Sequence, residues 1–286
     1  MDNMQNFLII TLFLIGSLGL IFLTWGLIEA SCLKVTHDKF IIKQTGDSSP
    51  DLRILYFSDL HRENCLVSAK RVLRVIKEEN SKAGLDAVIF GGDIADRAVN
   101  AHKSLDYINS IADLCRELHI PFMAVTGNHD SNVEPDELGA FKFDLMDGCI
   151  KYLKSGRTGE YIAFAGVHDS GRHGRYWDSP PNPSAGIPYS SYILLSHNPD
   201  IVLHMRPDMP FKVDGVISGH IHGGQIKTPI GLEFMVRKDA LPKKGIVSGI
   251  HEVNGMKLFI SKGIGCVVVP IRFLVRPEIN ILDIYC

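Results

Sequence analysis

Metal-binding side chains recur at the ends of five apolar segments of this chain. Each segment is a run of aliphatic or aromatic residues followed by a turn that carries Asp, Asn or His. The five segments with their turns are 57–61, 90–96, 126–130, 196–199 and 218–224. Ligands of α/β sheets collect beyond the carboxyl ends of the strands. We therefore expect these turns to meet at one place, although more than half of the chain separates the first from the last.

The side chains in these turns suit a pair of divalent cations. Residues i and i+2 of an extended chain point the same way, so Asp59 and His61 can face one point, as can His220 and His222. Carboxylate, imidazole and amide ligands suit manganese, iron or zinc. Their number exceeds the need of one ion, which favours a carboxylate shared by two ions. The candidate ligands are Asp59, His61, Asp93, Asn128, His197, His220 and His222.

Each of these turns also has an ordinary structural explanation when it is taken alone. An Asp after a strand is usually a turn or helix cap, and a lone His is more often a hydrogen-bonded core residue. Five such turns in one chain favour a functional site over coincidence.

The elements around the turns predict a layered α/β domain. Strands alternate with amphipathic helices in the first half, and short strands dominate the second, which favours two sheets flanked by helices. Helices are expected at 67–80 and 102–118. Strands are expected at 53–57, 87–90, 121–125, 161–165, 192–195, 213–217, 257–261 and 266–275. The long Pro- and Gly-containing connection 168–190 is either a functional loop or an ordinary surface excursion.

The N-terminal residues predict a membrane helix. Residues 7–28 contain no charged side chain, and as a helix they would span ~33 Å, against a hydrocarbon core of ~30 Å. A cleaved signal peptide is the alternative, but it usually begins with basic residues, and no Lys or Arg precedes this run. We expect a transmembrane anchor at 1–32, a linker at 33–50 and a domain at 51–286.

Charge and cysteine content set further expectations. Basic residues follow the apolar run and none precedes it, so a single-pass topology with the domain in the cytoplasm is predicted. These basic residues are Lys34, Lys39, Lys43 and Arg53. The net charge of -2 argues against a nucleic-acid partner. None of the six cysteines forms a CxxC pair, so neither a zinc ribbon nor a thioredoxin-like site is expected.

The order of the turns resembles the calcineurin-like metallophosphoesterase family over roughly residues 50–280. The matching blocks are Asp59-Leu60-His61, Gly92-Asp93, Gly127-Asn128-His129-Asp130, His197 and Gly219-His220-Ile221-His222. The block after His197, the residues through Gln225 and the ending Arg272-Phe273…Arg276-Pro277-Glu278 also resemble the bacterial YkuE/YaeI branch. Two departures are Lys262, where that branch commonly has Arg, and the lack of a twin-arginine export signal.

The resemblance implies a four-layer α-β-β-α sandwich and a role for each ligand. It implies that Asp59, His61 and His222 hold one ion, and that Asp93 bridges to a second. The ligands implied for the second ion are Asn128, His197 and His220. His129 is implied as a general acid or substrate hydrogen-bond donor, oriented by Asp130 or another acid. The implied reaction is hydrolysis of a phosphate ester or anhydride with two divalent ions, manganese being favoured.

The position of the expected anchor indicates a substrate at the membrane. About thirty residues separate the apolar run from Asp59, so a lipid-linked phosphate such as UDP-2,3-diacylglucosamine is one candidate substrate. Four arginines could bind its phosphates: Arg62, Arg97, Arg172 and Arg175. The alternatives are a general phosphodiesterase or phosphatase that the anchor merely localises, and a non-catalytic scaffold of the same fold.

Overall fold

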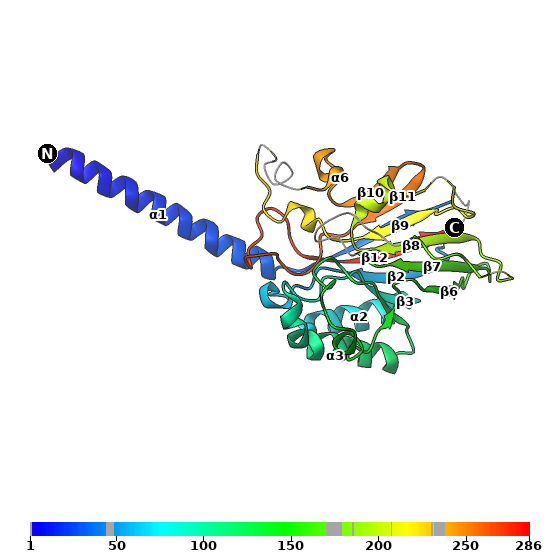
Figure 1. Ribbon diagram of the computed structural model, residues 1–286. Coiled ribbons are helices and arrows are strands. Elements are labelled where there is room, and N and C mark those ends of the chain that lie inside the picture. The colour runs from blue at the N-terminus through cyan, green and yellow to red at the C-terminus, as the bar shows by residue number, and fades with distance from the viewer. Residues whose placement is uncertain are drawn as a thin grey trace.

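The computed structural model describes residues 2–43, 49–169, 179–184, 186–206, 208–229, 231 and 238–286. Two six-stranded sheets lie face to face, and helices cover the outer side of the first sheet (Figure 1). Its strand order is β1 (Lys34–Ile41), β12 (Glu278–Tyr285), β2 (Leu52–Phe57), β3 (Ala87–Phe90), β4 (Phe122–Ala124) and β5 (Asp144–Leu145). The second sheet runs β10 (Gly249–Val253), β11 (Met256–Ile260), β9 (Gly215–Ser218), β8 (Ser191–Ser196), β7 (Tyr161–Val167) and β6 (Ile150–Lys154).

Three layers of apolar side chains hold the sheets and helices together. Strands β3, β8 and β9 are buried on both faces, which explains why they read as unbroken apolar runs. Side chains such as Tyr56, Phe164 and Phe259 fill the space between the sheets. A second cluster packs the first sheet against α2 (Ala69–Ala83) and α3 (Leu105–Glu117). The third lies beyond the second sheet, under short helices that include α6 (Ala240–Lys243).

This arrangement confirms the predicted α-β-β-α sandwich. In the part of the chain that the structure describes, the outer layer of the second sheet is slight, because α6 has four residues and the 3-10 helix η3 (Pro199–Leu203) has five. The expected helix at 102–118 begins as the 3-10 helix η2 (Ala98–Ser104) and becomes α-helical in α3. Both sheets are mixed, with parallel strands at their centres.

Two segments differ from the sequence prediction. The expected strand at 266–275 is wrong: these residues form an irregular loop, and the last strand is β12. Valines favour extended structure, but Pro270 lacks an N–H, and the φ angle of 66° at Val268 bends the chain. The expected linker at 33–50 contains β1, which pairs in parallel with β12 along its whole length. That pairing depends on a partner at the other end of the chain, so no local pattern predicts it.

The N-terminal helix α1 (Asp2–Ser31) projects away from the sandwich (Figure 1). The most apolar 18-residue stretch within Met4–Ser31 has a mean hydropathy of 2.6 and is not buried against the described residues. This length and composition fit a membrane span or a signal sequence.

Candidate metal centre

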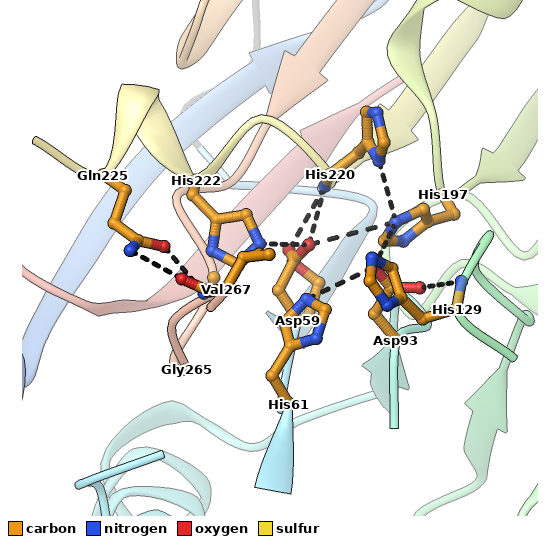
Figure 2. Close-up of polar contacts among 12 residues, drawn as sticks. Asp59, His61, Asp93, His129, His197, His220, His222, Gln225, Gly265 and Val267 are labelled. Carbon is orange, nitrogen blue, oxygen red and sulfur yellow. Dashed lines mark hydrogen bonds and ion pairs between the residues drawn. The ribbon is translucent and has the colours of Figure 1, made fainter. Parts of the chain in front are cut away.

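The five turns meet at one edge of the sandwich. Parallel strands β2, β3 and β4 end side by side in the first sheet, and β8 and β9 end side by side in the second. The turns after these strands bring the candidate ligands face to face across the two sheets (Figure 2). The distant turns therefore converge, as the sequence predicts. Three groups of side chains lie close enough together to hold a metal ion.

One group consists of Asp59, His61 and His222. Their possible ligand atoms all lie within 4.8 Å of one another. Nε2 of His222 is 3.3 Å from Oδ1 of Asp59. All three side chains are almost fully buried. A carboxylate and two imidazoles at this spacing are a donor set suited to manganese, iron or zinc.

A second group consists of Asp93, His197 and His220, again within 4.8 Å. Oδ2 of Asp93 lies 3.1 Å from Nε2 of His197 and 3.3 Å from Nε2 of His61. Because this oxygen contacts a histidine from each group, Asp93 lies between the two groups. Nδ1 of His220 lies 3.2 Å from Nε2 of His197, which directs two imidazole nitrogens to one place.

The ring of His197 is held in the orientation that a metal ligand needs. Its Nδ1 donates a hydrogen bond to the carbonyl of Gly91 at 2.7 Å. With the proton on Nδ1, the lone pair of Nε2 is directed at Asp93 and His220. This tautomer follows from the hydrogen bond to Gly91.

Charge in this buried cluster is balanced between carboxylates and imidazoles. Burial acts to lower the pKa of His197, but Asp93 and Asp59 outweigh it and hold the pKa well above its usual value. Burial acts to raise the pKa of Asp93, but His197 and His61 outweigh it and hold the pKa well below its usual value. The carboxylates thus require nearby positive charge, which divalent cations can supply in place of the histidine protons.

The amide of Asn128 supports the fit of this cluster to metal ions. Its Oδ1 is buried and has no hydrogen-bond partner among the described residues. A buried acceptor without a partner costs free energy, so this oxygen is expected to have a ligand in the working protein. His129, the next residue, donates its backbone N–H to Oδ1 of Asp93 at 2.9 Å, which ties this turn to the second group.

The backbone is strained where the ligands stand. Five candidate ligands have a left-handed φ, which residues other than glycine seldom adopt. They are Asp59 at 55°, His61 at 37°, Asp93 at 60°, His220 at 70° and His222 at 54°. Close approach adds a second constraint, since a Cβ on Gly127 would stand 2.2 Å from Oδ1 of Asp93. Strain and tight packing concentrated on one set of residues indicate a site preorganised for binding.

His129 and Asp130 have different surroundings, and the His129 ring contacts Asp96. Nδ1 of His129 lies 2.7 Å from the carbonyl of Asp96, which orients the ring. The carboxylate of Asp130 instead accepts hydrogen bonds from the backbone of Asp93, Ile94 and Gly127, at 2.7, 2.8 and 2.9 Å. Burial, and then Asp93, raise the pKa of Asp130 to about 7. Asp130 therefore holds two ligand turns together, whereas Asp96 orients the His129 ring.

Of the four arginines considered for phosphate binding, the structure describes Arg62 and Arg97. The guanidinium of Arg62 lies 5.8 Å from the centre of the Tyr107 ring and so faces α3. Arg97 is exposed at the start of η2. Arg172 and Arg175 lie outside the described residues, as do residues 170–178 of the long connection as a whole.

Arg272, which has no role predicted from the sequence, lies against the metal centre. This side chain is fully buried. Its Nη2 lies 3.4 Å from Nδ1 of His222 and donates to the carbonyls of Lys262 and Gly263 at 2.8 and 3.2 Å. Gly263 packs so closely on Asp59 that a Cβ there would lie 2.6 Å from the Asp59 Cβ. The only sequence signal was the place of Arg272 in a block shared with the resembled branch.

Comparison with known proteins agrees with this geometry. Residues 52–224 match the model of the calcineurin-like phosphoesterase family. The chain therefore belongs to this family and is a metal-dependent phosphoester hydrolase. It is 29% identical to the metallophosphoesterase YkoQ of Bacillus subtilis, covering 80% of this chain and 82% of that protein.

Two further relatives support the branch that the sequence resembled. The chain is 26% identical to the metallophosphoesterase YkuE of Bacillus subtilis, over 81% of this chain and 78% of that protein. It is also 26% identical to the phosphodiesterase YaeI of Escherichia coli, over 83% of this chain and 84% of that protein. The similarity thus extends over most of each relative.

Proposed function

We propose that the protein hydrolyses a phosphodiester or pyrophosphate bond at a membrane surface, with two divalent cations as cofactors. The observation that carries the proposal is the place where α1 joins the domain. Lys34, the first residue of β1, pairs with Glu278, and Asn280 of the same strand β12 pairs antiparallel with Tyr56 near the end of β2. The C-terminal end of α1 therefore lies on the same side of the first sheet as the end of β2, after which Asp59 follows.

The proposed ligands follow the two groups of side chains. Asp59, His61 and His222 would hold one cation, and Asp93 would be shared with the second. The ligands proposed for the second are Asn128, His197 and His220. When bound, the two cations would neutralise phosphoryl oxygens and lower the pKa of water enough to provide a nucleophile near neutral pH. Carboxylate, amide and imidazole donors suit manganese, iron or zinc, and manganese is the cation that we propose.

The proposed role of His129 is to give a proton to the leaving oxygen. The hydrogen bond from Nδ1 to Asp96 leaves Nε2 as the atom that can face a substrate. The side chain is 21% exposed, so a substrate can reach it from solvent. Its ring lies edge-on to that of His61, with centroids 4.8 Å apart, which places the proton donor beside the proposed cations. Asp130 would serve by holding the turns that carry Asp93 and Asn128.

A lipid-linked phosphate is the substrate class we propose, because the membrane anchor and the metal centre share one edge of the fold. Purified full-length protein in detergent-lipid micelles, with manganese added, should hydrolyse UDP-2,3-diacylglucosamine with a higher kcat/KM than bis(p-nitrophenyl) phosphate. The Asp93→Asn variant, which removes a charge shared by both groups, is the control for contaminating activity. Faster hydrolysis of the soluble diester would instead favour a general phosphodiesterase that the helix merely localises.

We also propose that α1 is a retained single-pass anchor with the catalytic domain in the cytoplasm. Basic residues gather after the helix: Lys34, Lys39, Lys43 and Arg53. Protease added to intact right-side-out vesicles should leave the domain uncleaved. Cleavage of the domain in these intact vesicles would show the opposite topology. A metal content below one ion per chain would favour the non-catalytic scaffold.

A further inference from the structure

The loop at 267–274, called here the apolar loop, exposes large hydrophobic side chains to solvent. The side chains of Val268, Val269 and Leu274 are 77%, 43% and 62% exposed. Isolated exposed apolar residues are common on proteins, but several on one short loop mark a contact surface.

The neighbour of the apolar loop is the last part of α1. The rings of Phe273 and Phe22 lie 4.9 Å apart. The backbone N–H of Arg272 donates to the carbonyl of Gly26 at 3.1 Å. The backbone N–H of Leu274 donates to Oε2 of Glu29 at 3.0 Å. Helix positions 22, 26 and 29 lie on one face because they are four and three residues apart. The loop therefore runs along one side of the helix.

These contacts place the loop at the depth of the apolar part of the helix. At 1.5 Å per residue, the contacts from Phe22 to Glu29 extend over ~10 Å of the helix axis. The uncharged run of α1 ends only at Ile28, so most of this length belongs to the membrane-compatible stretch. Trp25, which is 53% exposed, lies in the same turns and is a residue type favoured at membrane interfaces. A bilayer that surrounds α1 would therefore also reach the apolar loop.

Hydrogen bonds connect the apolar loop to the metal centre. The side chain of Gln225 donates to the carbonyl of Val267 at 3.0 Å and accepts from its N–H at 2.7 Å (Figure 2). The backbone carbonyl of Gln225 accepts from Phe273 at 3.0 Å. Gln225 is three residues beyond His222, so the segment that carries a candidate ligand also holds both ends of the loop. Movement of the loop relative to the metal centre is restricted by these bonds.

Basic side chains surround the junction between the helix and the domain. Arg71 donates to the carbonyl of Ser31 at 2.7 Å, and the exposed Arg276 donates to the carbonyl of Cys32 at 2.9 Å. Lys34, the first residue of β1, is also exposed. Basic groups next to exposed apolar side chains fit the boundary between lipid headgroups and acyl chains. The exposed apolar and basic side chains adjoin the proposed membrane helix directly. This position favours a bilayer over a protein partner as the surface that covers them.

We propose that the apolar loop inserts into the membrane interface beside α1 and holds the metal centre at the headgroups. This inference rests on the proposed anchor and deepens the proposed function. Helix and loop together give the domain two contacts with the bilayer, so its rotation about the helix axis is restricted. The metal centre formed by residues such as Asp59 and His222 then faces the phosphates of lipids in the bilayer.

Depth-dependent fluorescence quenching tests this proposal on the full-length protein. Val268→Trp, in a Trp177→Phe background, is reconstituted into vesicles of phosphatidylcholine with bromines at successive depths on the acyl chains. We expect emission from Val268→Trp to be quenched beyond that of the background, and most strongly by the bromines nearest the headgroup. The matched control is Tyr161→Trp, whose site is 38% exposed at the opposite end of the sandwich. This control should show no quenching beyond the background.

The native Trp25 separates failure of the loop from failure of the anchor. If Trp25 of the background protein is quenched and Val268→Trp adds no quenched emission, the loop stays outside the bilayer and the proposal is overturned. If Trp25 itself is not quenched, the membrane anchor fails, and with it the proposed function at a membrane. Leu274→Trp provides a second position on the loop and should be quenched like Val268→Trp, even if one variant folds poorly.

Discussion

Replacing Arg272 by methionine should weaken both the metal centre and the fold. The guanidinium lies on the turn from Lys262 to Gly265, and it donates to three backbone carbonyls of that turn. The same turn supports Asp59, because the N–H of Gly265 donates to the Asp59 carbonyl at 2.8 Å. Methionine keeps much of the length and volume of the side chain but has no donor. The turn would then be free to shift, and Asp59 and His222 with it.

The expected magnitude follows from the burial of this group. A hydrogen bond from a charged donor contributes ~1.5–3 kcal/mol, and part of this offsets the cost of burying the charge. A buried carbonyl left without a donor costs ~1–3 kcal/mol, so losing the donor to several carbonyls would lower the Tm of a domain of this size by roughly 10 °C. Loss of support behind metal ligands typically lowers metal affinity ~10–100-fold.

Thermal melting and manganese titration of the purified protein measure both effects. Arg276→Met is the matched control, because Arg276 is an exposed arginine that donates to the carbonyls of Cys32 and Leu33, just after α1. Arg272→Lys keeps the charge with fewer donors and should lie between the wild type and Arg272→Met. If Arg272→Met binds manganese as tightly as the wild type and melts at the same temperature, Arg272 does not position the ligands. If Arg272→Met does not fold, the titration of Arg272→Lys decides the question.

Three other measurements test the site and the fold. His129→Gln should lower kcat ~10²–10⁴-fold while metal content stays unchanged; normal turnover would exclude His129 as the proton donor. Removing metal with EDTA should abolish activity, and manganese at 100 times its Kd should restore activity and add about 2.7 kcal/mol of stability in the wild type but not in Asp93→Asn. Glu79, which bonds Lys82, His37 and Arg53, has a pKa lowered from 4.5 to about 2. Glu79→Gln should therefore cost up to about 3 kcal/mol near pH 7, and the difference from wild type in urea unfolding should vanish as pH falls from 4.5 to about 2; a difference that is independent of pH would contradict this.

Much of the candidate site could be predicted because its signals are local. Asp59 and His61, like His220 and His222, follow buried strands, and the identity of their side chains already indicates metal binding. The features of the site that local signals do not predict involve distant partners. Arg272 reads as one basic residue in an apolar segment until the fold buries it against His222. Asp130 is adjacent to His129 in sequence, but its carboxylate points to the backbone of another turn.

The sequence alone determined the two-sheet architecture, the chemistry of the ligands and the presence of an N-terminal helix able to span a membrane. These depend on side-chain type and on the short periods of strands and helices, which neighbouring residues set. Only the tertiary structure decided that β1 pairs with β12, and that the valines at 267–269 form a loop beside α1 rather than a strand. Those outcomes depend on packing between segments far apart in the chain, where burial and hydrogen bonding outweigh local propensity.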